Sequence, residues 1–207
     1  MTDDTHGDGD TGDGRPRLAQ LRDVETVYQP AEDSRLLAET ATEHGVGSGD
    51  LVLDVGTGSG YVAARVREET GARVVGADIN PDACRQASEA GVSVVRANLV
   101  APFCDEQFDI VVCNPPYLPT PPDQEWDDPM ERALSGGEDG RAMVDPFLAG
   151  VGRVLAPGGQ VYLLISTLTG PDAVRETARA AGFETAVVAT ESQPFERLLV
   201  LELTAAG

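Results

Sequence analysis

The stretch LVLDVGTGSGY, residues 51–61, decides the fold. Apolar residues on both sides of Asp54 predict a buried strand. Glycines at alternate positions, Gly56, Gly58 and Gly60, then let the backbone approach a ligand closely, and the next segment predicts a helix whose amide-rich first turn points toward that ligand. A strand, a glycine-rich loop and a helix in this order are typical of open α/β sheets, which bind ligands at the carboxyl ends of their strands.

The pattern of this stretch repeats along the chain. Nearly continuous apolar strands that alternate with helices predict a parallel sheet covered on both faces. The last two predicted strands are joined by six residues only, and so short a link requires an antiparallel pair. We therefore expect an α/β fold with a doubly wound, mostly parallel seven-stranded sheet that ends in an antiparallel hairpin. The predicted strands are 51–55, 73–77, 92–95, 108–113, 161–166, 183–190 and 197–203, and the predicted helices are 30–44, 61–70, 81–90, 142–155 and 171–181.

Length and composition favour one domain. The chain has 207 residues, of which 41% are apolar, so it can bury one core and has no room for a second large domain. Residues 1–17 are rich in Gly, Asp and Thr and offer almost nothing to bury. We expect a disordered acidic tail over residues 1–17 and a single domain over residues 18–207.

The charge of the chain is strongly one-sided. There are 35 acidic and 15 basic residues, all of the basic ones are arginine, and the net charge is −20. Such a surface repels itself at low salt and stays dispersed at high salt, so we favour a protein of a salt-rich, halophilic cytoplasm over a specific acidic function. Because a halophilic surface is acidic whatever it binds, the charge counts only weakly against a nucleic-acid substrate.

Cysteine and histidine usage argues against disulfides and against a catalytic metal. Cys84, Cys104 and Cys113 are odd in number and lack a CxxC spacing, which favours free thiols in a reducing compartment. Only His6 and His44 could add imidazole ligands, so we expect no metal site. No apolar run reaches the ~18 residues that span a bilayer, and the start of the chain lacks a signal-peptide pattern. We expect a cytoplasmic protein without membrane association.

Polar residues at three strand ends outline a ligand site. Asp78 ends the second predicted strand, 24 residues after Asp54, where a carboxylate suits a ribose diol. Asn98 and Leu99 follow the third strand and are placed to face an adenine edge. Asp54 itself suits the amino group of a methionyl moiety. Gly58, Gly60 and Ala63 also satisfy a dinucleotide fingerprint, which keeps an NAD enzyme as an alternative. A negative charge at Asp54 would repel a pyrophosphate, and no residues remain for a substrate domain.

The segment CNPPYLPTPP, residues 113–122, follows an apolar strand and contains five prolines, so it predicts a stiff loop at the mouth of the sheet. Planar nitrogens are poor nucleophiles because their lone pair is delocalised. The Asn114 side-chain oxygen and the Pro115 carbonyl could together accept both N–H groups of such a nitrogen and orient its lone pair. Pro116 fixes that carbonyl, and the Tyr117 ring offers a surface for a flat group.

These motifs carry a family resemblance. DVGTGSG, GADINP and NPPY in this order resemble the Rossmann-like class I S-adenosylmethionine-dependent methyltransferases that modify planar nitrogens. VYQPAEDSRLL (27–37), NPPYLPTPP and ALSGGEDGR (133–141) resemble more closely the archaeal and eukaryotic branch of the HemK-like glutamine methyltransferases. Members of that branch methylate N5 of the glutamine in the Gly-Gly-Gln motif of class I translation release factors. The resemblance covers residues 24–203.

The resemblance implies S-adenosylmethionine as the cofactor and assigns roles to residues. It implies that Asn114, Pro115, Pro116 and Tyr117 hold the acceptor glutamine. Asn98 departs from the pattern, since many relatives have aspartate there. The segment 121–130 contains Trp126 and is either a substrate clamp or a solvated acidic loop. The residues implied to line the cofactor are Ser34, Asp54, Gly56, Gly58, Gly60, Asp78, Ile79, Asn98, Leu99 and Asn114.

Other acceptors and a partner protein also follow from the resemblance. NPPY is shared with adenine-N6 methyltransferases, so an adenine or guanine amine in nucleic acid is an alternative acceptor, as is lysine in a protein. The absence of an arginine-rich cluster argues against direct nucleic-acid binding. A scaffold that binds cofactor without catalysis has no chemical reason to keep NPPY. Relatives are activated by a small zinc-ribbon protein, and the predicted strand 92–95 leaves an apolar sheet edge for a heterodimer or, alternatively, a homodimer.

Overall fold

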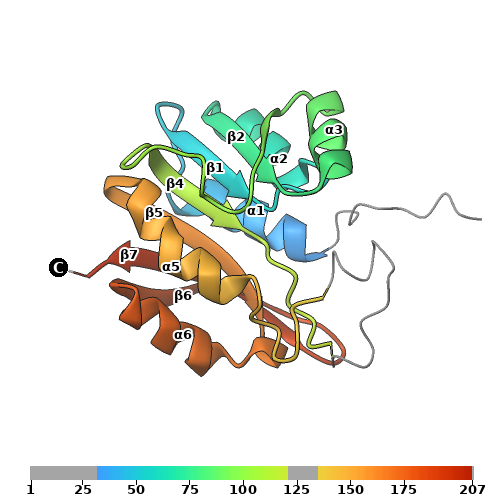
Figure 1. Cartoon of the computed structure of the whole chain (residues 1–207), viewed down its shortest axis with the longest axis vertical. Helices are drawn as coiled ribbons and strands as arrows, with labels where there is room; N and C mark the ends of the chain where they lie inside the picture. The colour runs from blue at the N-terminus through green and yellow to red at the C-terminus, as the bar shows by residue number, and fades with distance from the viewer. Residues whose placement is uncertain (1–31, 121–134, 207) are drawn as a thin grey trace, which may run out of the picture.

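The computed structural model describes residues 32–120 and 135–206 of the chain. Its seven-stranded sheet has the strand order β3-β2-β1-β4-β5-β7-β6 (Figure 1). The first five strands in this order are parallel neighbours, and β7 lies antiparallel between β5 and β6. The predicted doubly wound sheet with its C-terminal antiparallel hairpin is therefore confirmed. The strands are β1 (Leu51–Val55), β2 (Arg73–Asp78), β3 (Ser93–Arg96), β4 (Phe108–Cys113), β5 (Leu155–Ser166), β6 (Phe183–Ser192) and β7 (Arg197–Ala205).

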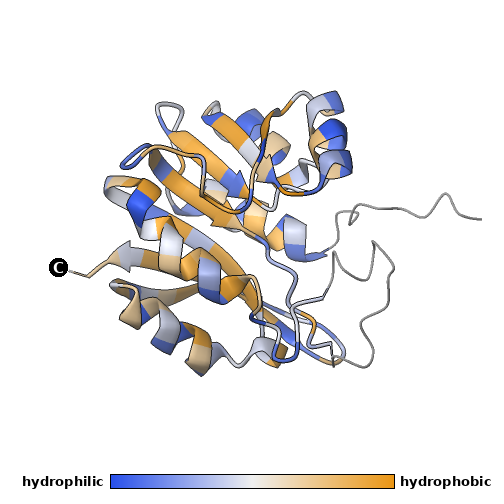
Figure 2. Cartoon of the chain, in the orientation of Figure 1, coloured by the Kyte–Doolittle hydropathy of each residue, from blue (hydrophilic) through white to orange (hydrophobic). Residues whose placement is uncertain are grey.

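Successive residues of a strand point to opposite faces of the sheet, and here both sets are apolar. Helices therefore cover both faces. On one face Leu37 of α1 and Val66 of α2 pack with Val52 of β1. On the other face Phe147 of α5 packs with Leu53, the next residue of the same strand. Figure 2 shows the resulting contrast between hydrophobic strands and the polar outer surface of the helices. The helices are α1 (Glu32–His44), α2 (Tyr61–Thr70), α3 (Pro81–Glu89), α5 (Val144–Val154), α6 (Pro171–Ala180) and the 3-10 turn η3 (Thr167–Thr169).

The largest difference from the predicted elements is at the start of β5, which begins at Leu155 where a helix was expected to end and the strand to start at residue 161. Leu155 pairs with Phe108, and the register then shifts before the next pair. Two glycines permit this bulge. Gly158 has a φ of +83°, and a Cβ at Gly159 would lie 2.9 Å from the Asp109 carbonyl oxygen. In the sequence, Pro157 and the two glycines after it indicate the end of a helix and a loop. They do not indicate that the strand continues through them.

The remaining boundaries agree within a few residues, as expected for helix and strand ends. The predicted tail over residues 1–17 lies outside the described residues, so the domain boundary stays a prediction. The same holds for the segment 121–130 with Trp126. The three cysteines are free thiols, of which only Cys113 is buried.

Candidate active site

A cavity of about 870 Å³ opens at the carboxyl ends of β1, β2 and β4. Figure 1 places these strand ends on the same side of the molecule as the start of α1 and the turn between β6 and β7. Parallel strands deliver their following residues to one edge of the sheet, which is why residues far apart in sequence meet there. The cavity brings together every predicted site residue except one: Ser34, Asp54, Gly56, Gly58, Asp78, Ile79, Asn98, Leu99, Asn114, Pro115, Pro116 and Tyr117.

Gly60 is the exception, because it is not among the residues that line the cavity. Its φ of +82° caps the start of α2, and a Cβ there would lie 3.0 Å from the Ala87 backbone in α3. The glycine therefore allows close packing between α2 and α3 rather than close approach to a ligand. The sequence pattern of three alternate glycines does not distinguish these two uses.

Asp78 joins the glycine loop to the start of α3. Its Oδ2 accepts a hydrogen bond from the Gly58 N–H at 2.9 Å, and its Oδ1 accepts one from the Asn80 N–H at 2.8 Å. Each carboxylate oxygen has a second lone pair, so the group can still accept two hydrogen bonds from a ligand in the cavity. The loop is also pinned by the N–H groups of Gly56 and Thr57, which both donate to the Ala77 carbonyl.

Asp54 is a buried acid, only 2% exposed, at the end of β1. Its Oδ2 accepts hydrogen bonds from Thr57 Oγ1 at 2.7 Å and from the Ala63 N–H at 3.2 Å. Burial nevertheless raises the pKa of Asp54 to about 6, because desolvation outweighs these two hydrogen bonds and the charge of Asp78 adds to it. Thr57 was not predicted as a site residue. A hydroxyl three positions after a buried acid is the only local sign of its role.

Apolar side chains form the wall beyond Asp78. Ile79 is 62% exposed although it lines the cavity, and Leu99 beside it has a φ of +50°, in the left-handed region that few residues other than glycine adopt. Arg96 Nε donates a hydrogen bond to the Ile79 carbonyl oxygen at 3.1 Å. An exposed isoleucine and a strained leucine at the mouth of one cavity form a surface for a flat apolar group.

The Asn114 side chain is the polar group at the end of β4. Its Nδ2 donates to Ser34 Oγ in α1 at 3.3 Å. Its Oδ1 is buried, and within the described parts of the chain it has no hydrogen-bond partner. Buried acceptors are rarely left unpaired because the lost hydration costs about 1–3 kcal/mol. The Asn114 oxygen therefore marks a position where a ligand donor fits.

Helix α1 also reaches the tyrosine of this segment. The Tyr117 hydroxyl lies 3.5 Å from Asp33 Oδ2, and Asp33 is buried beside Ser34. A separation of 3.5 Å is long for an O–H···O hydrogen bond, so the contact holds the ring only weakly in this geometry. Asp33 was not predicted as a site residue, since nothing in the sequence near it indicates that it meets Tyr117.

The segment 135–141 supports the proline-rich loop from behind. The Gly136 N–H donates to the Leu118 carbonyl at 2.9 Å, and the Thr120 N–H donates to the Gly137 carbonyl at 2.8 Å. Gly140 has a φ of +76°, and a Cβ there would lie 2.6 Å from the Tyr117 carbonyl oxygen. This packing gives a physical reason for the glycines of the ALSGGEDGR motif. The sequence alone shows only that the motif resembles that of the HemK-like family.

Met143 and Glu196 are among the other lining residues that were not predicted from the sequence. Met143 precedes α5 and contacts the glycine loop, since its Cε would lie 3.2 Å from a Cβ at Gly56. Glu196 comes from the turn between β6 and β7. In the described residues no three His, Cys, Asp or Glu side chains cluster as a metal site would require, and no helix there is long and apolar enough to cross a bilayer.

This sheet, with its glycine loop, strand-end acids and Asn-Pro-Pro-Tyr segment, defines a class I S-adenosylmethionine-dependent methyltransferase. A methyltransferase-domain family model matches residues 52–137. A putative protein N5-glutamine methyltransferase of Methanocaldococcus jannaschii is 35% identical over 84% of this chain and 90% of its own length. Methyltransferase HEMK2 of Homo sapiens is 31% identical over 86% of this chain and 89% of its own. The chain belongs to the HemK-like methyltransferases.

Solved structures agree with this family. The E. cuniculi Mtq2-Trm112 complex, which methylates the eRF1 translation termination factor, matches 88% of this chain and 99% of its own with a TM-score of 0.72 at 28% identity. The complex between the Haloferax volcanii Trm112 activator and a putative methyltransferase matches 84% and 92% with a TM-score of 0.58 at 21% identity, which shows a common fold. The glycine pattern is therefore that of an S-adenosylmethionine enzyme and not of an NAD enzyme.

Proposed function

We propose that this chain methylates N5 of the glutamine in the Gly-Gly-Gln motif of a translation release factor. The observation that carries the proposal is the buried, unpaired Oδ1 of Asn114, which lies in the same cavity as Asp54 and Asp78. A primary amide presents two N–H donors on one planar nitrogen, and this oxygen together with the Pro115 carbonyl can accept both. The names of the relatives from Methanocaldococcus jannaschii and E. cuniculi support the same acceptor.

The cavity fits S-adenosylmethionine group by group. When bound, the cofactor supplies a methyl group on a positively charged sulfur. The Asp54 carboxylate would pair with the amino group of the methionyl part, and the two free lone pairs of Asp78 would accept the ribose hydroxyls. Ile79 and Leu99 would lie against the adenine ring, and Asn98 would accept a hydrogen bond from its amino group. Gly56 and Gly58 would leave room for the cofactor to lie close to the backbone, and Ser34 would lie near the methyl group because it holds Asn114.

The acceptor nitrogen must change shape during transfer, and the chain supplies the groups that assist this change. Oδ1 of Asn114 is fixed because Nδ2 is held by Ser34, so the oxygen needs no reorientation as positive charge develops on the nitrogen. Pro116 restricts the backbone that presents the Pro115 carbonyl. Tyr117 would lie against the flat amide and limit its rotation.

Cofactor affinity should depend on pH through Asp54. Its pKa of about 6 without ligand means that the acid is mostly protonated at pH 5 and must release a proton to pair with an ammonium group. The affinity for S-adenosylmethionine is therefore full above pH 7 and falls as the pH drops below 6, by roughly tenfold at pH 5. Calorimetry in buffers of different ionisation enthalpy should show proton release at pH 5.5 and almost none at pH 7.5. Asp54→Asn should bind more weakly with a flat profile, and an unchanged slope in this variant would contradict the assignment.

The acceptor is tested by mass spectrometry of a purified release factor after incubation with the enzyme and S-adenosylmethionine at molar salt. We expect a gain of one methyl group on the glutamine of the Gly-Gly-Gln motif. Substitution of that glutamine by asparagine in the release factor is the matched control and should abolish the gain. Methylation of a lysine, or of adenine or guanine in added RNA or DNA, would replace the proposed acceptor. Cofactor binding without any transfer would favour the scaffold alternative.

We also propose a small zinc-ribbon activator as a partner that covers β3. Within the described residues β3 pairs only with β2, at one end of the sheet, and Val95 on it is 38% exposed. An apolar edge strand invites pairing with another chain. The similar chains from E. cuniculi and Haloferax volcanii are in complexes with Trm112, which supports an activator over a homodimer.

Val95→Lys should prevent the heterodimer from forming, because a charged side chain would have to be buried against the partner. Val187→Lys is the matched control: Val187 has nearly the same exposure, 37%, on β6 at the opposite end of the sheet. Co-expression followed by affinity purification should recover the activator with the parent and with Val187→Lys, and not with Val95→Lys. Recovery with all three would place the partner elsewhere.

A further inference from the structure

Phe195, in the turn between β6 and β7, is the most exposed large apolar side chain of the described residues, at 95%. Leu118, which lines the same cavity as Glu196 of this turn, and Leu168 are 37% and 45% exposed. A fully solvated phenylalanine is unusual on a chain whose net charge is −20. A large apolar side chain that is left fully exposed can mark an interaction site.

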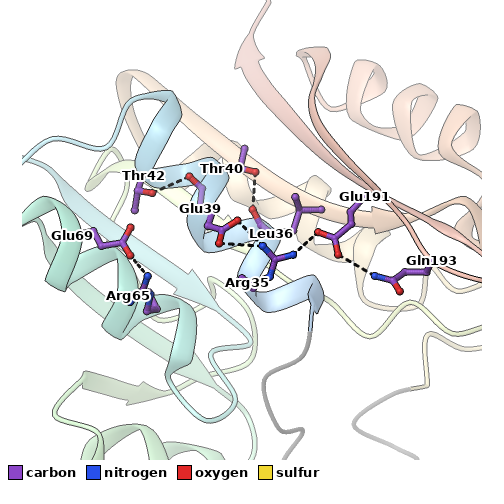
Figure 3. Close-up of polar contacts among 9 residues, drawn as sticks. All are labelled: Arg35, Leu36, Glu39, Thr40, Thr42, Arg65, Glu69, Glu191 and Gln193. Carbon is purple, nitrogen blue, oxygen red and sulfur yellow. Dashed lines mark hydrogen bonds and ion pairs between the residues drawn. The ribbon is translucent and has the colours of Figure 1, made fainter.

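The turn that carries Phe195 is held in place on one side by α1. Arg35 Nη2 forms an ion pair with Glu191 Oε2 at 2.7 Å, and Gln193 Nε2 donates a hydrogen bond to Glu191 Oε1 at 3.1 Å (Figure 3). Arg35 also pairs with Glu39 of its own helix, which fixes the guanidinium. Glu191 at the end of β6 therefore connects the turn to the helix that begins beside Asn114.

The other side of the turn is held by the end of β5. Ser166 Oγ donates to the Glu196 carboxylate, and the Arg197 N–H donates to Thr167 Oγ1 at 3.0 Å. The turn is closed by the Gln193 N–H, which donates to the Glu196 carbonyl at 2.9 Å. With contacts on both sides, the turn presents Phe195 to solvent in a defined position, and an aromatic side chain fixed in this way loses little entropy on binding.

Glu196 and Leu118 connect this turn to the active site, because both line the cavity that contains Asn114. The strand order explains the geometry. Asp78 ends β2, Asn114 follows β4, and Glu196 precedes β7, so Asn114 lies between the Asp78 end of the cavity and the turn. An acceptor nitrogen that reaches Asn114 therefore enters a cavity that the turn also lines, through Glu196.

We propose that the β6–β7 turn, residues 193–196, is the docking element for the acceptor protein. This inference rests on the proposed function. Phe195 inserts into an apolar site on the release factor next to its glutamine loop, and the Glu196 carboxylate accepts a hydrogen bond from an N–H group of that loop inside the cavity. A protein surface is favoured over nucleic acid because the hairpin carries the carboxylates of Glu191 and Glu196, which repel phosphates, whereas aromatic anchors are typical of protein interfaces.

The first measurement is binding, separated from catalysis. Labelled release factor is titrated with enzyme–activator complex at saturating S-adenosylhomocysteine and read by fluorescence anisotropy. Phe195→Ser should raise the Kd at least about tenfold, the loss expected for an interface anchor. Val187→Ser, in the same hairpin and outside the cavity lining, should bind as the parent does. Because Phe195 is solvated, its replacement should leave the melting temperature unchanged, and Phe195→Leu should recover part of the affinity.

The second measurement uses two acceptors. With the release factor, Phe195→Ser should raise KM and leave kcat unchanged. With a free Gly-Gly-Gln peptide, which lacks the surface that Phe195 contacts, it should have no effect. Glu196→Gln keeps an acceptor for Ser166 but removes the charge, so it should lower kcat/KM with both acceptors.

Two results would overturn docking at the turn. One is release-factor binding by Phe195→Ser within twofold of the parent. The other is a parental homodimer in sedimentation that Phe195→Ser dissociates, since the turn would then bind a second copy of this chain. A parent that binds cofactor yet neither binds nor methylates the release factor overturns the proposed function itself, which makes the two failures distinguishable.

Discussion

Asn114→Ala should transfer methyl groups about 10²–10³ times more slowly than the parent, equivalent to roughly 2.7–4 kcal/mol, the loss typical of one preorganised hydrogen-bonding group. The reason is that Oδ1 of Asn114 is held in place without a partner, and its bond to the acceptor amide strengthens as the nitrogen becomes tetrahedral. The measurement is single-turnover transfer to the release factor at saturating cofactor. Affinity for the cofactor should fall as well, because the same side chain is proposed to border the methyl donor.

Three further variants make this result specific. Ser34→Ala removes the partner of Nδ2 and leaves Oδ1 in the site, so it should reduce the rate less than Asn114→Ala does. Tyr117→Phe should have little effect on transfer, since it keeps the ring proposed to lie against the acceptor amide, whereas Tyr117→Ala should raise the KM for the acceptor. Thermal melts check folding in each case. Parental transfer rates in Asn114→Ala would mean that the strand ends in asparagine for structural reasons alone.

Asp78→Ala should weaken cofactor binding by about 1.5–3 kcal/mol, the range for hydrogen bonds to a charged group. The structure adds a second cause to the loss of ribose contacts. The N–H groups of Gly58 and Asn80 lose their acceptor, so the glycine loop and the start of α3 are no longer joined. Calorimetry with S-adenosylhomocysteine gives the affinity, and a value within twofold of the parent would rule out the ribose assignment.

The two causes can be separated with a ligand that lacks the ribose 2′-hydroxyl. If Asp78 binds the diol, removing the hydroxyl should weaken binding to the parent and have much less effect on Asp78→Ala, because the partner is already gone. Equal and additive losses would show that Asp78 acts only by holding the loops. Asp50→Ala, a change of the same type in the exposed turn before β1, should bind both ligands as the parent does.

The parts of the site that could be predicted from the sequence are those that follow their strand directly. Asp54, Asp78 and Asn114 each end a strand whose apolar pattern is unmistakable, and parallel strands must bring their ends together. Glu196 and Asp33 could not be predicted in this way. Asp33 lies 84 residues from Tyr117, and Glu196 reaches the cavity only because β7 inserts between β5 and β6, a pairing that no local pattern specifies.

The glycine spacing in the sequence predicts where the backbone is free to adopt unusual conformations. It does not predict what each glycine does in the fold. Gly56 and Gly58 line the cavity, Gly60 serves helix packing, and Gly158 and Gly159 permit a bulge inside β5. The same residue type at similar spacing thus has three physical roles. Only the neighbours that a Cβ would meet distinguish them, and those neighbours come from distant parts of the chain.

The strand order has an implication for how new substrates evolve on this fold. Most groups proposed to hold the methyl donor lie at or just after the ends of β1, β2 and β3. Those proposed to meet the acceptor protein belong to the hairpin of β6 and β7, with Asn114 at the boundary after β4. A mutation in the hairpin turn can therefore alter which molecule is modified without disturbing the donor pocket. Descendants of one ancestral enzyme could in this way move from one nitrogen acceptor to another while inheriting the same chemistry.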